Sequence, residues 1–175
     1  MKPPPARIAT ERLVLRNWEP DDAGAFGELL AGSRDHFAAF IPFFLDGEPA
    51  ERIAGYRAAF AAGESFSYAA FHGGDLIGGG GLFPRVGPNA LEIGYHVRAE
   101  RVRQGYASEI AAALVDIGFR VCRVGRLEMH IDSDNVASLG VAAKLGFVEA
   151  GYDPANAVSI FSRVRPASES STRSA

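Results

Sequence analysis

The chain has 175 residues, of which 22% are charged, and its formal net charge at pH 7 is −3. This length fits one domain that buries about two-thirds of the surface of its unfolded chain, and the charge gives no reason to expect a nucleic acid or an anionic membrane as a partner. Cys122 is the only cysteine, so an intrachain disulfide is excluded. A reducing compartment is then the simplest location. Because no apolar run is long enough to cross a bilayer, we expect a cytoplasmic protein without a membrane anchor.

The first third of the chain predicts one strand and two helices. Residues 8–16 alternate leucines with polar residues, which is typical of a strand. Residues 18–22 supply turn and N-cap chemistry for a helix that ends near Gly32, and Glu48 and Pro49 open a second helix that continues through Ala62. Between these helices, residues 36–45 gather large apolar side chains around a proline. This segment is either a loop that lines the core or a wall that faces a substrate.

The next segment predicts a hairpin. Residues 65–71 and 76–83 are its two strands, because Gly73, Gly74 and Asp75 form a turn signal between them. The second strand contains four consecutive glycines at 78–81. No Gly-Lys-Ser/Thr sequence follows them, so a phosphate-binding P-loop is excluded. We expect instead a strand that bulges or that approaches another part of the backbone closely.

The central stretch predicts a strand followed directly by a long helix. Apolar residues occupy alternate positions in residues 91–97, and they recur at helical spacing from Ile110 to Val121. Gly105 lies in the connection, where the chain turns and exposes the N–H groups of the first helical turn. Gly105 either only allows the chain to reverse its direction or helps to form a cradle for an anion.

The last third predicts one strand, one helix that contains Ser138, and two closing strands, over residues 126–131, 135–146, 147–152 and 158–164. Residues 166–175 are polar and lack aromatic side chains, so we expect a disordered tail. The elements together predict one α/β domain over residues 8–165. Its mixed, largely antiparallel sheet is flanked by helices, with three strands before the central one and three after it.

Three stretches carry a family resemblance, namely Thr10–Arg16, Val102–Ala107 and Asn135–Phe147. In this order they resemble the GNAT superfamily of acyl-CoA-dependent N-acetyltransferases, and the first and last resemble its RimJ/RimL type. The resemblance implies acetyl-CoA as co-substrate. It also implies a central strand that carries a bulge and splays from its neighbour, so that a V-shaped cleft opens for the acyl-CoA arm.

The resemblance places the coenzyme on two parts of the chain. Main-chain N–H groups at the start of a helix suit a diphosphate, since their oriented dipoles need no titratable partner. We assign this contact to Arg103, Gln104, Gly105, Tyr106, Ala107 and Ser108. The exposed backbone of the central strand would pair with the pantetheine amides as an extra strand does, at His96, Val97 and Arg98. Asn135 caps its helix or binds pantetheine, and capping does not exclude binding.

Transfer to an amine requires a base, a stabilised oxyanion and a proton for the departing thiolate. Glu92 lies in the strand before the cradle and is the first candidate for the base, while His96 on the same strand face is the second. Many GNAT proteins use a tyrosine as the acid at the position of Ala142, which has no proton to give. Ser138 lies one helical turn earlier and is our candidate for a hydroxyl near the sulfur.

The sequence therefore predicts an N-acetyltransferase in which the acceptor amine attacks acetyl-CoA directly in a ternary complex, without a metal. The acceptor is a protein N-terminal amine or a small amine. The sequence leaves open whether the protein forms a homodimer. The alternative is a non-catalytic module that binds acyl-CoA. Val102, which replaces the first anchor of the family's loop pattern, and Ala142 favour this alternative.

Overall fold

The computed structural model describes residues 1–167, so the predicted disordered tail falls outside the described residues from position 168 onward. One sheet runs through the molecule in the order β1-β2-β3-β4-β5-β6-β8-β7. Its strands are β1 (Arg7–Ala9), β2 (Val14–Asn17), β3 (Phe66–His72), β4 (Asp75–Phe83), β5 (Ala90–Val97), β6 (Arg126–Asp132), β7 (Val148–Asp153) and β8 (Val158–Val164). Neighbouring strands are antiparallel except β5 and β6, which confirms the predicted mixed, largely antiparallel sheet.

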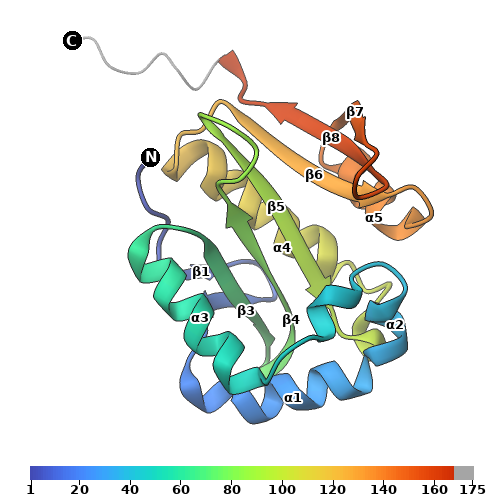
Figure 1. Cartoon of the computed structure of the whole chain (residues 1–175). Coiled ribbons are helices and arrows are strands. Elements are labelled where there is room, and N and C mark those ends of the chain that lie inside the picture. The colour runs from blue at the N-terminus through green and yellow to red at the C-terminus, as the bar shows by residue number, and fades with distance from the viewer. Residues whose placement is uncertain (168–175) are drawn as a thin grey trace.

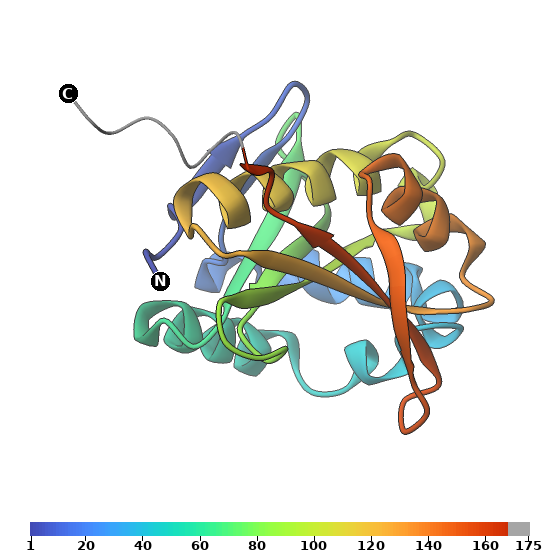
Figure 2. The ribbon, with the colours of Figure 1, turned by 90° about the horizontal axis from the view of Figure 1, so that it is seen from above.

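Helices cover both faces of this sheet (Figures 1 and 2). They are α1 (Ala23–Gly32), α2 (Arg34–Ala38), α3 (Pro49–Ala62), α4 (Tyr106–Asp116) and α5 (Val136–Lys144). Helix α4 lies on one face, where its buried Ile110 and Leu114 join the cluster that contains Leu91 and Ile93 of β5. Helices α1 and α3 lie on the opposite face over a second cluster. The alternation along β5 and the helical spacing of α4 therefore bury the apolar residues that the sequence predicted.

The start of the chain forms two short strands and not the single strand predicted over residues 8–16. The turn between β1 and β2 is held by Thr10, whose N–H donates to Leu13 O (2.9 Å) and whose hydroxyl accepts from Leu13 N–H (3.0 Å). These bonds reverse the chain, so Ile8 pairs with Leu15. Four strands therefore precede β5, and the prediction of three was wrong.

The aromatic segment at 36–45 lines the core at two of its rings. Phe37 on α2 is 2% exposed, and its ring lies 5.3 Å from that of Phe44 in the short 3-10 helix Pro42–Leu45. Both rings pack against His96 of β5. Phe43 points outward and is 70% exposed. The core-lining interpretation therefore holds for Phe37 and Phe44.

The glycine run of β4 allows close approach between layers. A Cβ atom on Gly80 would lie 2.9 Å from Ile110 Cγ2 and 3.0 Å from Leu114 Cδ1, so any side chain here would push α4 from the sheet. A Cβ on Gly79 would lie 2.5 Å from Tyr68 O. The expectation of close approach at 78–81 is thus confirmed. The pairing of β3 with β4 shifts register nearby, at Ala70 and Phe71.

Strands β5 and β6 separate after a short contact, as Figure 1 shows. Their pairing covers only Ala90–Glu92 against Arg126–Glu128, whereas β5 pairs with β4 as far as Val97. The implied splay is therefore present. The implied bulge in the central strand is not found, because the β4–β5 register runs without a shift from Glu92 to Val97. Glu92 and Glu128 form the last pair before the strands diverge, so they mark the fork of the cleft.

Candidate active site

The loop that enters α4 presents unpaired main-chain N–H groups. Gly105 is the N-cap residue with φ of 83°, a left-handed conformation that suits glycine, and Arg103 also has a positive φ of 62°. The N–H of Glu109 is bonded to Gly105 O (3.1 Å). The N–H groups of residues 106–108 precede that bond and have no acceptor within the helix. The connection therefore has the form of an anion cradle.

Arg12, in the turn between β1 and β2, contacts this loop directly although it is distant in the sequence. Its Nε–H donates to Glu109 Oε2 (2.7 Å), its Nη1–H donates to Gln104 O (2.9 Å), and its guanidinium lies 4.5 Å from the centre of the Tyr106 ring. Nη2 lies near Gly105, since a Cβ added there would be 3.3 Å away. Val102, which replaces the first anchor of the family pattern, is 36% exposed. Arg12 thus supplies an anchor that the valine lacks, and its guanidinium lies beside the cradle as the ion-pair partner of Glu109.

The open edge of β5 faces the cleft with alternate backbone groups. The N–H of Arg98 donates to Ile77 O (2.8 Å), so it points toward β4. Backbone groups of successive residues point to opposite sides of a strand, which directs those of His96 toward β4 as well and those of Tyr95 and Val97 toward the cleft. Of the three residues that the sequence assigned to pantetheine, only Val97 has backbone groups that face the cleft, whereas those of His96 and Arg98 face β4.

A charged cluster lies at the fork. Arg85 donates to Glu92 through Nε–H (2.7 Å) and Nη2–H (2.6 Å), and Glu92 is only 7% exposed. His130 of β6 lies across the fork, with Nδ1 4.0 Å from Glu92 Oε2 and Nε2 3.0 Å from Glu128 Oε2. Arg126 Nε lies 2.8 Å from the other oxygen of Glu128. The bonds to Glu92 raise the pKa of Arg85. The cluster places an imidazole between two buried carboxylates.

His96 lies in an apolar enclosure. The centre of its ring is 4.1 Å from that of Phe44 and 5.8 Å from that of Phe37, and its Nε2 is buried without a hydrogen-bond partner in the described part of the chain. Burial, with a smaller contribution from the charge of Arg52, lowers the pKa of His96 to about 3. A base must reach the proton that it removes. The enclosed ring of His96 argues against its role as the second candidate base.

Two hydroxyl groups lie on the other side of the cleft. Asn135 Oδ1 accepts the N–H of Ser138 (3.1 Å), so Asn135 caps α5. Tyr95 Oη is buried and forms no hydrogen bond with the described residues. Burial raises the pKa of Tyr95, and the nearby Ser138 side chain partly opposes this effect. Ala142 is fully buried. The two hydroxyls near the cleft therefore belong to Ser138 and Tyr95.

The chain matches the family described as "Acetyltransferase (GNAT) domain" over residues 12–148, most of its length. The chain belongs to the GNAT acetyltransferase family. The predicted family and fold are thereby confirmed. Among curated proteins, this GNAT protein is 37% identical over 75 residues to the uncharacterized protein YkkB of Bacillus subtilis. That stretch is 42% of this chain and 44% of YkkB, so the alignment spans less than half of the relative.

Solved structures resemble the whole GNAT domain. RimL, a ribosomal L7/L12 alpha-N-protein acetyltransferase in complex with coenzyme A, has a TM-score of 0.81 and 21% identity, covering 91% of this chain and 98% of that one. Mycobacterium smegmatis RimJ, in complex with a CoA-disulfide, has a TM-score of 0.79 and 20% identity, covering 91% and 84%. At these identities the likeness concerns the fold. The solved structures that share this fold therefore include RimL and RimJ proteins.

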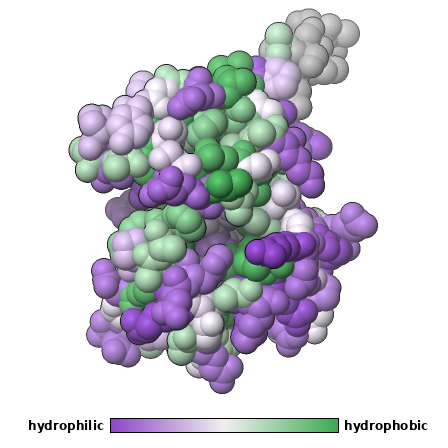
Figure 3. Space-filling view, turned by 90° about the vertical axis from the view of Figure 1, so that its right-hand side faces the viewer, coloured by the Kyte–Doolittle hydropathy of each residue, from purple (hydrophilic) through white to green (hydrophobic). Residues whose placement is uncertain are grey.

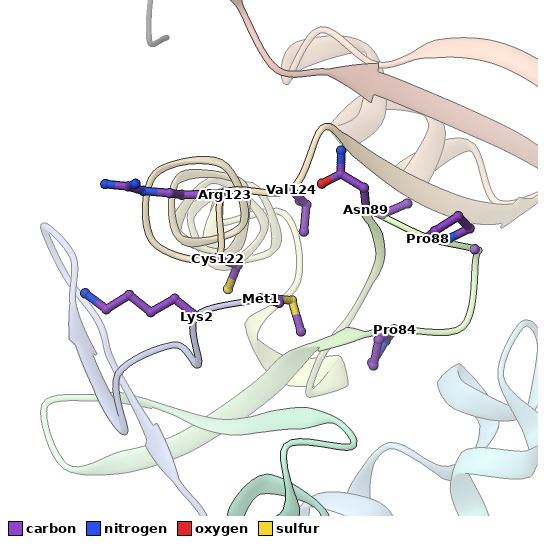
Figure 4. A pocket seen from close by; sticks show the side chains of 10 residues that line it. Met1, Lys2, Pro84, Pro88, Asn89, Cys122, Arg123 and Val124 are labelled. Carbon is purple, nitrogen blue, oxygen red and sulfur yellow. The ribbon is translucent and has the colours of Figure 1, made fainter. Parts of the chain in front are cut away.

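A further pocket of the GNAT protein lies at the N-terminal end of β5 (Figure 4), and its lining includes neither the cradle residues nor Glu92, Glu128 or His130. Its volume is about 640 Å³, and it is lined by the two N-terminal residues, the turn before β5 and the segment after α4, namely Met1, Lys2, Pro84, Gly87, Pro88, Asn89, Ala90, Cys122, Arg123 and Val124. Burial raises the pKa of Cys122 to about 11, so the thiol stays protonated at neutral pH.

A recess also crosses the face shown in Figure 3, on the side of α2, α5 and β7.

Sequence reasoning missed several residues of this site. Arg12 was noticed only as part of a strand motif, because its contacts with α4 join residues more than ninety positions apart. Tyr95 was counted only among the alternating residues of the central strand. Arg85 lies in the connection between β4 and β5 and was not a candidate. The only signal for His130 was its position two residues after Glu128 on one strand face.

Proposed function

We propose that this GNAT protein transfers the acetyl group of acetyl-CoA to a primary amine by direct attack in a ternary complex. One observation carries the proposal: the cradle of unpaired N–H groups at Gly105 adjoins the cleft between β5 and β6. A diphosphate is the part of coenzyme A that such a cradle suits, since helix dipoles favour negative charge at an N-terminus. RimL and RimJ, which share the fold, were each solved with a form of coenzyme A.

Residues along the cleft are arranged for the rest of this substrate. The N–H groups of residues 103–108 would hold the diphosphate, with Arg12 beside them. The cleft-facing backbone of Tyr95 and Val97 would pair with the pantetheine amides. The hydroxyls of Ser138 and Tyr95 would donate hydrogen bonds to the departing thiolate. They would take the role of the tyrosine that many GNAT proteins carry at the position of Ala142. Asn135 caps α5, and its amide nitrogen stays available for pantetheine.

The acceptor is a cationic amine in this proposal. Two buried carboxylates, Glu92 and Glu128, lie at the fork where the acetyl group would arrive, and carboxylates favour an ammonium group. The RimL relative is described as an alpha-N-protein acetyltransferase, which supports a protein N-terminus as one class to test. Small amines are the other class. Among residues 1–167 no helix is long and apolar enough to span a bilayer, and we propose the cytoplasm as the location.

A binding module without catalytic activity is the second candidate. Ala142 favours it, because the buried methyl group cannot donate a proton. The discriminating experiment measures thiol release from acetyl-CoA with a panel of small amines and of peptides with free N-termini, and measures coenzyme binding in parallel. Amine-dependent thiol release supports the transferase. Coenzyme binding without release by any acceptor supports the module.

A further inference from the structure

We propose that His130 is the general base that removes the proton from the acceptor ammonium, and that Glu92 binds this ammonium without taking its proton. The inference rests on the proposed acetyl transfer. In the sequence prediction, Glu92 is instead the first candidate for the base and His96 the second. Its basis is the arrangement of His130 between Glu92 and Glu128 at the fork of the cleft.

Glu128 orients the imidazole. His130 Nε2 lies 3.0 Å from Glu128 Oε2, a distance at which the ring N–H donates to the carboxylate. When Nε2 carries the hydrogen of the neutral ring, Nδ1 carries the free electron pair. Nδ1 is also the nitrogen that faces Glu92. Glu128, held in turn by Arg126 at 2.8 Å, therefore fixes the ring in the form that a base requires.

The gap between His130 and Glu92 fits an ammonium nitrogen. Nδ1 and Glu92 Oε2 are 4.0 Å apart, which is too far for a direct hydrogen bond. A nitrogen placed between them can lie about 2.9 Å from both, at ordinary hydrogen-bond distances. Gly94 follows two residues after Glu92 on the same strand face, and the Phe83 ring packs against it, since an added Cβ would lie 3.2 Å from Phe83 Cε2. The acceptor can thus bind to the carboxylate and the imidazole together.

Arg85 makes Glu92 better suited to binding than to proton transfer. Both carboxylate oxygens of Glu92 already accept hydrogen bonds from one guanidinium, at 2.6 and 2.7 Å. These charge-assisted bonds occupy one acceptor site on each carboxylate oxygen and hold the Glu92 side chain in place. A carboxylate retains further lone pairs, so Glu92 can still accept a bond from an ammonium. Glu92 therefore attracts the acceptor, and the neutral imidazole takes the proton.

The charged groups around His130 come from four parts of the fold. Glu92 lies on β5, Glu128 and Arg126 lie on β6, Arg85 lies in the connection before β5, and Asp153 at the end of β7 interacts electrostatically with the ring. Asp132 follows on the same face of β6, and one of its oxygens accepts the Asp134 N–H. Carboxylates outnumber guanidinium groups in this set, which suits a cationic acceptor.

The reaction balances with these groups alone. The acceptor R–NH3+ gives one proton to His130 Nδ1, and the nitrogen electron pair forms a bond to the thioester carbon. The C–S bond then breaks, and the second proton lost by the new amide nitrogen balances the one that the departing thiolate takes up. The sum is R–NH3+ and acetyl-CoA giving N-acetylated amine, CoA-SH and one H+. The His130 side chain is 24% exposed, so this proton can pass to water.

The test uses the full chain and follows thiol release against pH with an amine that the unmodified protein accepts. We expect His130→Gln to lower kcat by about 100-fold or more, in keeping with the contribution of a general base, and to remove the rise of the rate with pH that the unmodified protein shows. We expect Glu92→Gln to raise KM for the amine and to keep that rise. His36→Gln is the matched control, since His36 is exposed on α2.

A second variant separates catalysis from structure. In His130→Ala, added imidazole should restore thiol release several-fold, while a merely structural loss would not respond to imidazole. Calorimetric binding of acetyl-CoA should be unchanged in all three site variants. A pH-dependent rate that survives in His130→Gln, or a pH dependence that disappears only in Glu92→Gln, would overturn the role of His130 alone. Absence of thiol release by the unmodified protein would instead contradict the proposed function.

Discussion

Arg12 Nε lies 2.7 Å from Glu109 Oε2, and this ion pair joins the turn between β1 and β2 to the first turn of α4. The Thr10 hydroxyl also donates to Glu109, so the carboxylate accepts bonds from two residues of that turn. These bonds lower the pKa of Glu109 although burial opposes them. The first hairpin therefore holds the loop that would bind the coenzyme, which explains a contact between a strand motif and a helix motif of the family.

Arg12→Ala should weaken acetyl-CoA binding by about tenfold, because the loss of charge-assisted bonds to the loop corresponds to about 1–2 kcal/mol. The effect should fall on KM for acetyl-CoA and leave kcat nearly unchanged. Steady-state thiol release measures both. Arg120→Ala is the control, since Arg120 forms an exposed ion pair with Asp116 near the other end of the same helical segment. Equal effects of the two substitutions would show that the Arg12 contact does not shape the cradle.

Ser138→Ala should slow turnover by about ten- to a hundredfold if the hydroxyl stabilises the departing thiolate. Tyr95→Phe should act in the same direction. The double variant should be little slower than the worse single one, because the two hydroxyls would serve one sulfur. Single-turnover rates check this. Ser133→Ala, in the exposed turn before α5, is the control. A wild-type rate in Ser138→Ala would move the role to another group.

The buried His96 should make folding stability depend on pH. Its pKa of about 3 in the folded protein lies below the ordinary value of 6.5, so the unfolded chain binds more protons between these values. Stability contributed by the neutral ring is therefore full above pH 6.5 and falls as the pH drops toward 3. The free energy of unfolding should be about 2 kcal/mol lower at pH 5 than at pH 7.5 from this group alone.

Urea unfolding of the wild type and of His96→Leu at several pH values tests this estimate. The difference between the two proteins isolates His96 from other acidic groups. This difference in the free energy of unfolding should change between pH 5 and pH 7.5. The leucine variant should gain stability relative to the wild type as the pH falls. A pH-independent difference would show that the ring reaches solvent or a partner when it is protonated.

Gly80→Ala should lower the free energy of unfolding by about 1–3 kcal/mol, the usual range for overpacking. The added methyl group would lie 2.9 Å from Ile110 and 3.0 Å from Leu114, between sheet and helix. Gly55→Ala is the matched control, because Gly55 lies on α3 with no atom within 4 Å of the added carbon. This control should be neutral or stabilising by up to about 1 kcal/mol. Chemical denaturation compares the two.

The sequence was most informative where one local pattern decided the structure. The alternation in β5 and the helical spacing of α4 correctly located the central layer, and Gly105 was correctly identified as the turn between them. The prediction of one strand over residues 8–16 was wrong, because the Thr10 hydroxyl accepts a bond from Leu13 N–H and the chain turns there. The hydrophobic pattern of the sequence does not indicate such a bond. A single hydroxyl that forms a turn gives only a weak signal in a stretch where apolar and polar residues alternate.

The site was predicted in part. Motifs indicated the cradle and the residues Glu92 and Ser138, but the partners of those residues lie on other elements. Neither the two bonds from Arg85 to Glu92 nor the position of His130 follows from spacing, since both depend on how β5 and β6 meet at the fork. Whether the backbone of position 96, 97 or 98 faces the cleft depends on the hydrogen-bond register with β4, which the sequence does not contain.

The measurement that tests the central claim most directly is calorimetric titration of acetyl-CoA into the folded protein, into Gly105→Ala and into Gly63→Ala. Gly105 and Gly63 both adopt positive φ at a helix end, 83° and 73°, so alanine strains both backbones. Only Gly105 lies at the cradle. We predict binding by the wild type, a loss of at least about tenfold, or 1.4 kcal/mol, in Gly105→Ala, and wild-type affinity in Gly63→Ala. Absence of binding by the folded wild type, or full affinity in Gly105→Ala, would contradict the assignment of the cradle to coenzyme A.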